Sequence, residues 1–222
     1  MSAKRKLESF YSPMLAEDGM KTDLGKEGYI AEPKLDDTRC ISERDEDGIR
    51  IYGRKGLTYN EILPQIRKSL EKIRAYFRLD GGLVYIDKEG HMIFAGSQKR
   101  CQISNPKKVE QYAKAYPLIY YVWDIMMLNG ENLEDLPYAK RRLILTHFIE
   151  LQKALYGLDN IRLVPASTEH KKMYDFYTSK GFEGVVLKRI NGKYTKAKRS
   201  FNWLKIKCRD HTPFVLADNA KL

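Results

Sequence analysis

The sequence predicts an α+β domain in which antiparallel sheets are covered by helices. Short β-rich runs come in neighbouring pairs, and the pair within residues 29–52 is divided by the turn signal DEDG at 45–48. Apolar residues recur at helical spacing in a few longer segments. The 222 residues are 43% hydrophobic, which is enough for a sizeable core. Strands that follow one another closely pair antiparallel, so the helices are left to cover the sheet faces.

The first part of the chain is expected to hold a charged lead-in, two strands and one helix. Residues 1–27 are the lead-in, and their apolar patch at 12–16 is expected to pack on the main body. The helix is predicted over residues 60–76, because a single apolar face is formed by Ile62, Ile66, Leu70, Ile73 and Phe77.

The middle of the chain is expected to alternate strands with one short helix. Pro106 suits the first turn of that helix, where its missing N–H is not needed. The strand-like segments are residues 78–87, 91–95 and 118–126.

Two helices and two strands are expected in the last part of the chain. Pro137 opens the longer helix, whose apolar face is expected to consist of Ile144, Phe148, Leu151 and Leu155. The shorter helix covers residues 169–179. Strands at 185–188 and 203–207 flank a basic, glycine-containing loop, residues 189–200, which is expected to be exposed.

Charge and cysteine usage limit the setting in which the protein works. The chain has 40 Lys+Arg against 29 Asp+Glu, a net charge of +11. Such a domain is compatible with a polyanionic partner, most commonly nucleic acid, although many basic proteins bind none. No apolar run approaches the roughly 20 residues that span a bilayer, so no membrane partner is expected. Cys40, Cys101 and Cys208 lack metal-ligand spacing, and we expect free thiols in a reducing cytoplasm.

The segment EPKLDDTR, residues 32–39, carries the candidate nucleophile. Lys34 is flanked by Glu32 and Asp36 and lies five residues before Arg39, at the end of a predicted strand. An amine attacks only when it is unprotonated, and partial burial or neighbouring cations favour that form. In a chain so rich in charges, a solvated turn would give the same spacing. The segment therefore needs the support of other motifs.

Further motifs occur in a fixed order along the chain, and together they resemble the nucleotidyltransferase (adenylation) domain of ATP-dependent DNA ligases. The similarity is greatest to the ligase domain of the bacterial and archaeal end-joining type, and it runs from residue 12 to residue 208. The matching segments are EPKLDDTR at 32–39, Gly53-Arg54, LDGGLV at 79–84, YVWDI at 121–125 with residues 128–137 and Arg141-Arg142, EGVVLK at 183–188 and WLKIK at 203–207.

The resemblance implies a fold of two antiparallel sheets flanked by helices, with an ATP cleft between them, as in nucleotidyltransferases and ATP-grasp-like ligases. It implies that residues 1–208 form this domain. Residues 209–222 are then a C-terminal tail, which is either the start of an OB-fold in a longer protein or the end of a minimal catalytic core. It also implies that Lys34 attacks the α-phosphorus of ATP and carries AMP covalently.

The same resemblance assigns the remaining site residues. Glu32 accepts a hydrogen bond from the adenine amino group, Trp123 stacks on adenine, and Arg54 lies on the ribose and DNA side. Arg39, Lys205, Lys207 and Lys188 contact phosphate oxygens. Strand alternation places Lys205 and Lys207 on one face, which supports that role. Glu183 and Asp36 are the expected ligands of Mg²⁺ or Mn²⁺, which takes its other ligands from phosphates and water.

The implied activity is that of an ATP-dependent DNA ligase, which transfers AMP to a DNA 5′-phosphate and seals nicks in double-stranded DNA. DNA repair, replication and recombination are the implied processes, and the cytoplasm, beside the nucleoid, is the implied location. We expect a monomer, with an OB-fold domain or a repair partner absent from this chain. Without such a clamp, binding to the duplex would be weak and strongly salt-dependent.

Two positions within the motifs depart from the family pattern. Asp37 stands where the family usually has glycine, and Gly82 stands where it usually has a glutamate that contacts ribose or metal. The absence of that glutamate is expected to affect nucleotide affinity and metal binding. One hypothesis is that Asp37 supplies the missing carboxylate from the neighbouring strand end.

Three interpretations follow from the sequence. The first is a working DNA ligase core. The second is a catalytically impaired nucleotide- or DNA-binding module that has lost the glutamate at position 82. The third is an RNA ligase or an mRNA-capping guanylyltransferase, which share the lysine motif. The retained Lys34, Glu183, Lys205 and Lys207 favour the first, and the segment 123–137 is more similar to DNA ligases than to the other two enzymes.

Overall fold

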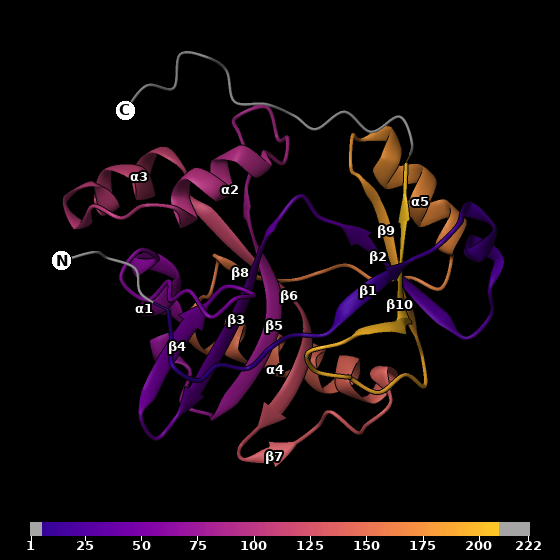
Figure 1. The fold of residues 1–222 in the computed structure, drawn as a ribbon, viewed down its shortest axis with the longest axis horizontal. Coiled ribbons are helices and arrows are strands. Elements are labelled where there is room, and N and C mark those ends of the chain that lie inside the picture. The colour runs from indigo at the N-terminus through magenta and orange to yellow at the C-terminus, as the bar shows by residue number, and fades with distance from the viewer. Residues whose placement is uncertain (1–5, 209–222) are drawn as a thin grey trace.

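A computed structural model describes residues 6–208, in which two sheets lie side by side and helices cover their outer faces (Figure 1). The smaller sheet has the order β1-β10-β9-β2. Its strands are β1 (Leu15–Asp18), β2 (Tyr29–Lys34), β9 (Gly184–Arg189) and β10 (Arg199–Lys207). The predicted α+β class with two sheets is confirmed.

The larger sheet has the order β4-β3-β5-β6-β7, with β8 paired to β6. Its strands are β3 (Thr38–Asp45), β4 (Gly48–Tyr52), β5 (Phe77–Tyr85), β6 (Leu118–Leu128), β7 (Glu131–Asn132) and β8 (Ile161–Leu163). Two pairs depart from the expected antiparallel pattern, because β1 runs parallel to β10 and β8 runs parallel to β6. Long connections separate the strands of both pairs, and a crossover of that kind allows parallel pairing.

Five α-helices and two short 3₁₀ segments complete the described part of the chain. They are η1 (Lys21–Gly25), α1 (Pro64–Lys72), α2 (Phe94–Cys101), η2 (Pro106–Lys108), α3 (Val109–Ala115), α4 (Tyr138–Tyr156) and α5 (His170–Ser179). Helix α5 lies against β2 and β9 on the outer side of the smaller sheet, and α4 lies against β6 (Figure 1). None of these helices combines the length and hydropathy needed to cross a bilayer.

Period-two alternation in the smaller sheet separates its core from its inner face. Ala31, Val185, Leu187, Leu204 and Ile206 point outward, where they pack with Tyr174 of α5 in one apolar cluster. The residues between them therefore face the larger sheet. This alternation puts the charged side chains of the EPKLDDTR, EGVVLK and WLKIK motifs on one surface.

Several predicted elements differ from the observed ones. The apolar repeat of residues 62–77 is fully buried as expected, but the helix itself begins only at Pro64 and ends at Lys72. Helix α2 replaces the end of the extended segment expected at 91–95. The 1–27 lead-in contains β1 and η1, and its Met14 is fully buried. The expected tail, residues 209–222, lies outside the described residues.

Helix α4 begins after Pro137 as predicted but buries a different face. Leu151 and Leu155 are 55% and 60% exposed, so their expected place in the core was wrong. The buried face of the helix consists of Tyr138, Arg141, Leu145, Phe148, Ile149 and Gln152. Both sets repeat at helical spacing, and the buried set includes an arginine and a glutamine whose burial depends on tertiary partners.

Candidate active site

Three rows of cross-strand neighbours on the smaller sheet organise the site. Lys34 of β2 lies opposite Gly184 of β9, which lies opposite Lys207 of β10. Two residues further along, Glu32, Val186 and Lys205 form the next row, and then Ile30, Lys188 and Trp203. Because neighbours in a row have Cβ atoms about 5 Å apart, the strand register alone gathers these groups.

Gly184 makes the close approach around Lys34 possible. Its φ of +145° lies in a region that L side chains rarely adopt, and a Cβ there would lie 2.0 Å from the backbone oxygen of Ile206. The glycine thus lets β9 begin tightly against β10, directly after Glu183. This turn places the Glu183 carboxylate at the end of the Lys34–Lys207 row.

The carboxylate of Glu183 bridges two lysines. Its Oε2 accepts a hydrogen bond from the Lys34 Nζ, and its Oε1 lies 2.5 Å from the Lys207 Nζ. Burial acts to raise the pKa of Glu183, but the hydrogen bonds from Lys207 and Lys34 outweigh it and hold the pKa below its ordinary value. The side chain of Lys34 is 22% exposed, so its amine is both held in place and accessible.

Lys205 and Arg39 also have acidic partners. The Lys205 Nζ lies 3.1 Å from Asp18 Oδ1 on β1. Arg39 donates through Nε (2.6 Å) and Nη2 (2.5 Å) to the fully buried carboxylate of Asp80, and through Nη2 to the backbone oxygen of Met14 (2.9 Å). The last bond ties the larger sheet to the start of β1.

A β-bulge in the larger sheet directs Trp123 toward the site. Asp80 of β5 pairs with Asp124 of β6, whereas the next residue of β5, Gly81, pairs with Val122. Trp123 is therefore the extra residue, and a bulge of this kind reorients the side chain it carries. Its indole ring lies 5.1 Å from the Arg39 guanidinium carbon. Its Nε1 is buried and makes no hydrogen bond in the described structure.

Glu32 is the centre of a buried polar network. Its Oε1 accepts from the hydroxyl of Tyr138 and from Arg142 Nη1 (3.1 Å), and its Oε2 lies 2.7 Å from the Lys188 Nζ. An ionised carboxylate offers about four acceptor positions, so one remains for a ligand. Lys188 also donates to the backbone oxygen of Trp123 at 2.9 Å, and burial lowers its pKa in spite of Glu32.

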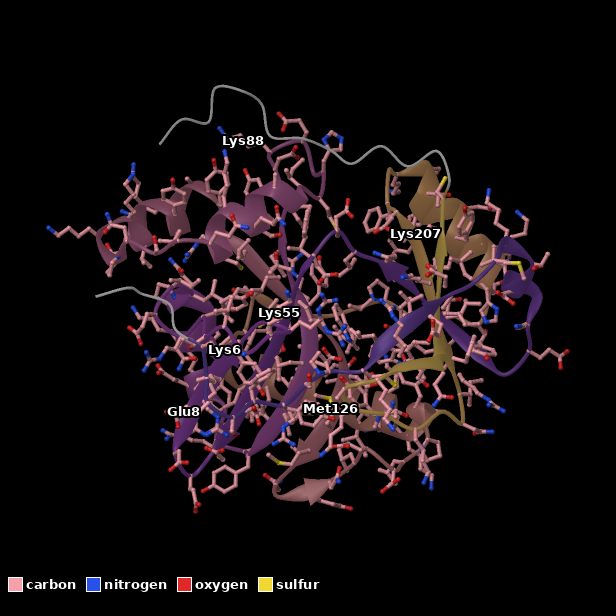
Figure 2. The ribbon with its side chains drawn as sticks, in the orientation of Figure 1. Lys6, Glu8, Lys55, Lys88, Met126 and Lys207 are labelled. Atoms are coloured by element: carbon pink, nitrogen blue, oxygen red, sulfur yellow. The ribbon has the colours of Figure 1, made fainter. Side chains whose placement is uncertain are left out.

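Three adjoining hollows lie between the sheets. The first, which we call the inner cavity, has a volume of about 150 Å³ and is lined by residues that include Glu32, Lys34, Arg39, Trp123, Lys188 and Lys205. The lysine hollow is lined by Lys34, Asp36, Asp37, Phe94, Glu183 and Lys207. The outer hollow includes Arg39, Arg54, Lys55, Gln98, Gln102 and Trp123. Figure 2 labels Lys207 on the smaller sheet and Lys55 on the side of the larger one.

Asp37 lies where the three hollows meet, because it lines all of them. Burial raises the pKa of its carboxyl to about 7, although the charges of Lys34 and Arg39 act to lower it. Within residues 6–208 its carboxylate makes no hydrogen bond or ion pair.

The expected metal ligands lie on one cavity. Asp36 and Glu183 both line the lysine hollow, beside Lys34. The described residues contain no group of three or more His, Cys, Asp or Glu side chains that could hold a metal alone. Mg²⁺ is commonly held by one or two carboxylates together with phosphate oxygens and water, so this donor set fits it when a nucleotide is bound.

The structure brings most of the predicted site residues together, with two qualifications. Arg54 lies on the outer hollow and not in the inner cavity with Lys34, although the two hollows share Arg39 and Trp123. Lys188 is only 2% exposed and already bonded to Glu32 and the Trp123 carbonyl. The predicted contact of Lys188 with a phosphate stays a prediction. The Lys188 ammonium lies beside Glu32 in the inner cavity.

Two residues that support the site were not assigned from the sequence. Tyr138 and Arg142 hold Glu32 from the first turns of α4, more than 100 residues away in the chain. The only available signal was the Arg141-Arg142 pair within the ligase-like segment. Arg141 itself is fully buried, where it binds the equally buried Asp124 next to Trp123.

Comparisons with known proteins agree with this geometry. A family model described as "ATP dependent DNA ligase domain" matches residues 13–207. The DNA ligase 1 of Methanosarcina mazei is 31% identical over 80% of this chain and 32% of its own length. The bifunctional non-homologous end joining protein LigD of Bacillus subtilis is 27% identical over 79% of this chain and 31% of its own length.

A solved structure described as mycobacterial DNA ligase D complexed with ATP and MES shares the fold. The match has a TM-score of 0.70 at 23% identity and covers 89% of this chain and 60% of that one. The chain spans about a third of the length of the first curated relatives it matches. Since the family model covers nearly all of the described residues, the chain belongs to the ATP-dependent DNA ligase family.

Proposed function

We propose that this chain is the adenylation core of a DNA ligase and that Lys34 is its nucleophile. One observation supports this most directly: the Lys34 amine lies in a cavity with an aromatic side chain, Trp123, and several cations, and it is held there by Glu183. These groups suit the two ends of a nucleotide: the aromatic surface suits the base, and the positive charges suit the phosphates.

In the first step the lone pair of the Lys34 nitrogen forms a bond to the α-phosphorus of ATP. The bond from that phosphorus to the bridging oxygen breaks, and pyrophosphate leaves with the electron pair. Glu183 orients the amine and is the nearest acceptor for the proton it loses.

The cations around Lys34 compensate the negative charge of the phosphates. Lys205 lines the same cavity, and Lys207 lies across Glu183 from Lys34. Phosphoryl transfer depends mainly on in-line positioning and on such charge compensation. Mg²⁺ held by Glu183 and Asp36 would supply further charge neutralisation at the phosphate oxygens.

The later steps use DNA as the acceptor. An oxygen of a DNA 5′-phosphate attacks the phosphorus of the lysyl-adenylate, and the P–N bond to Lys34 breaks. The 3′-hydroxyl at the nick then attacks the 5′-phosphorus, and AMP leaves. Arg54 on the outer hollow is exposed and suits a contact with the DNA backbone.

We place this activity in DNA repair, with replication and recombination as related processes, and we propose nicked duplex DNA as the substrate. A reducing cytoplasm beside the nucleoid suits the three free cysteines of the chain, Cys40, Cys101 and Cys208. We further propose that the chain works as a monomer.

Incubation with labelled ATP or GTP tests the adenylation step. Wild-type protein is expected to take up label from ATP, and Lys34→Ala is expected to lose it. Lys171→Ala, which alters a lysine on α5 whose side chain is 75% exposed, is the matched control and should label like wild type. Labelling from GTP alone would indicate a capping-type enzyme, and no labelling at all would indicate a module without catalytic activity.

A further inference from the structure

Asp37 is an unpartnered acid at the centre of the site. It lines the inner cavity, the lysine hollow and the outer hollow, and among residues 6–208 no other residue lines all three. Its carboxylate makes no hydrogen bond or ion pair with residues 6–208. The neighbouring cations are already engaged, because Lys34 binds Glu183 and Arg39 binds Asp80. The carboxylate is therefore free to accept hydrogen bonds from a ligand.

The space for this carboxylate is provided by Gly82. A Cβ built on Gly82 would lie 2.4 Å from Asp37 Oδ1 and 2.6 Å from its Cβ, closer than side-chain carbons approach other atoms. Gly82 pairs with Arg39 across the β3–β5 register, so the backbone at this point has little room to move apart. Asp37 and a side chain at position 82 thus exclude one another, and the carboxylate occupies the volume above the glycine.

The position of Asp37 along a bound nucleotide follows from its neighbours. Trp123, in the same cavity, suits the base, and Lys34 must reach the α-phosphorus. The sugar connects these two parts of the nucleotide, so it lies between Trp123 and Lys34. Asp37 shares the inner cavity with both residues.

The chemistry of a carboxylate selects the sugar as its ligand. A carboxyl group offers an oxygen that accepts a hydrogen bond whether it is protonated or ionised, and in its ionised form it repels phosphate oxygens. The ribose hydroxyls are neutral donors in the part of the nucleotide nearest to Asp37. We propose, on the basis of the proposed adenylation function, that Asp37 accepts a hydrogen bond from a ribose hydroxyl and makes the site select ribonucleotides over 2′-deoxyribonucleotides.

Single-turnover adenylation with ATP and with 2′-deoxy-ATP tests this role. Since a hydrogen bond to a charged group changes an equilibrium or rate by about ten- to a hundredfold, the wild type should prefer ATP by that factor. In Asp37→Ala the preference should fall to about onefold, while Asp37→Asn, whose amide oxygen still accepts, should keep part of it. In Asp36→Asn, the matched control on the adjacent carboxylate, the ratio of the ATP rate to the 2′-deoxy-ATP rate should stay that of wild type, whatever the change in the two rates.

The exchange of the two positions provides an independent test. Gly82→Glu alone should impair adenylation, because the new side chain collides with Asp37. Asp37→Gly combined with Gly82→Glu should restore both the adenylation and the ATP preference, since the carboxylate is again present without the collision. Thermal unfolding of each variant identifies any that fail to fold. If the effects of Asp37→Gly and Gly82→Glu on the adenylation rate simply add in the double variant, the two positions do not compensate for one another and the proposal is wrong.

Two outcomes would overturn the role of Asp37, namely no preference in the wild type or an unchanged preference in Asp37→Ala. A failure of adenylation itself is a separate result and contradicts the proposed function. In that case Lys34→Ala is titrated with ATP and with 2′-deoxy-ATP, and binding is followed by tryptophan fluorescence. This titration still measures the ratio of the two affinities. Both tryptophans of the chain line the inner cavity, so they report on its occupation. An equal affinity for the two nucleotides would again reject the proposal.

Discussion

The buried ion pair between Arg141 and Asp124 is predicted to hold the Trp123 end of the site in place. Both side chains have no exposed surface, and the guanidinium donates to the two carboxylate oxygens at 2.8 and 2.9 Å. Arg141 also donates to the backbone oxygens of Leu136 (2.6 Å) and Gly192 (3.1 Å). It therefore joins α4, β6 and the loop after β9.

Replacing Arg141 by methionine should destabilise the fold strongly. Removal of one partner leaves Asp124 as an uncompensated buried charge, which costs about 3–5 kcal/mol in comparable pairs. The Leu136 carbonyl, which loses its donor, adds about 1 kcal/mol, whereas the Gly192 carbonyl still accepts from the Tyr138 N–H. Domains of this kind unfold with roughly 5–15 kcal/mol, so the loss is a large share of the total. Urea unfolding followed by circular dichroism measures the change.

Two controls separate the ion pair from a general effect of substitution. The double variant Asp124→Leu with Arg141→Met should recover much of the lost stability, because a buried apolar pair avoids the unpaired charge. Lys171→Met, which breaks an exposed pair with Asp175 on α5, should change stability by less than about 0.5 kcal/mol. A loss below about 1 kcal/mol in Arg141→Met, or a double variant no better than the single one, would refute the reasoning.

Three further predictions concern the nucleotide site and the fold around it. Trp123→Ala should weaken ATP binding by about tenfold or more, since stacking of a base on an aromatic ring contributes about 1–3 kcal/mol, whereas Trp123→Phe should keep most of the affinity measured by calorimetry. Glu183→Gln should lower the single-turnover rate of adenylation more than it lowers ATP affinity, because the amide holds the Lys34 amine less firmly; an equal loss in both would contradict that role. Asp23 has a pKa lowered by its hydrogen bonds to Lys26 and the backbone, so its stabilising contribution is complete at neutral pH and is lost as the pH falls below about 4, and Asp23→Asn should remove this part of the acid sensitivity in thermal unfolding.

The shared face of Lys205 and Lys207 could be predicted from the sequence because it follows from local alternation along one strand. Glu32 and Lys34, and likewise Lys205 and Lys207, are two residues apart on strands, so each pair must share a face. Once β2 and β10 both pair with β9, the four side chains are gathered without any further information. The position of Glu183 followed from its motif, directly before the glycine that opens β9.

The parts that could not be predicted depend on contacts between distant segments. Tyr138 and Arg142 reach Glu32 only because α4 packs against the cleft, and sequence spacing carries no signal of this. The bulge at Trp123 appears only when β5 and β6 are paired. The exposed Leu151 has the same helical spacing as a core residue, so its face is decided by which side of α4 meets the sheet.

Asp37 and Gly82 also show which features the sequence predicts and which only the structure reveals. The sequence shows both departures from the family pattern, and their common cause could be suggested from it as a hypothesis. That the two residues compete for one volume follows only from the β3–β5 pairing. A Cβ added at Gly82 would lie 2.4 Å from Asp37 Oδ1, which supports the compensation hypothesis, and the variants described above test it.

The most direct measurement is the location of AMP on the chain after incubation with ATP and Mg²⁺. Intact-protein mass spectrometry should show the addition of one AMP, and peptide mapping should place it on Lys34. The adduct should be lost in acid and survive in alkali, as expected of a P–N bond. AMP on any other residue, or none on a folded protein that binds ATP, would contradict the account.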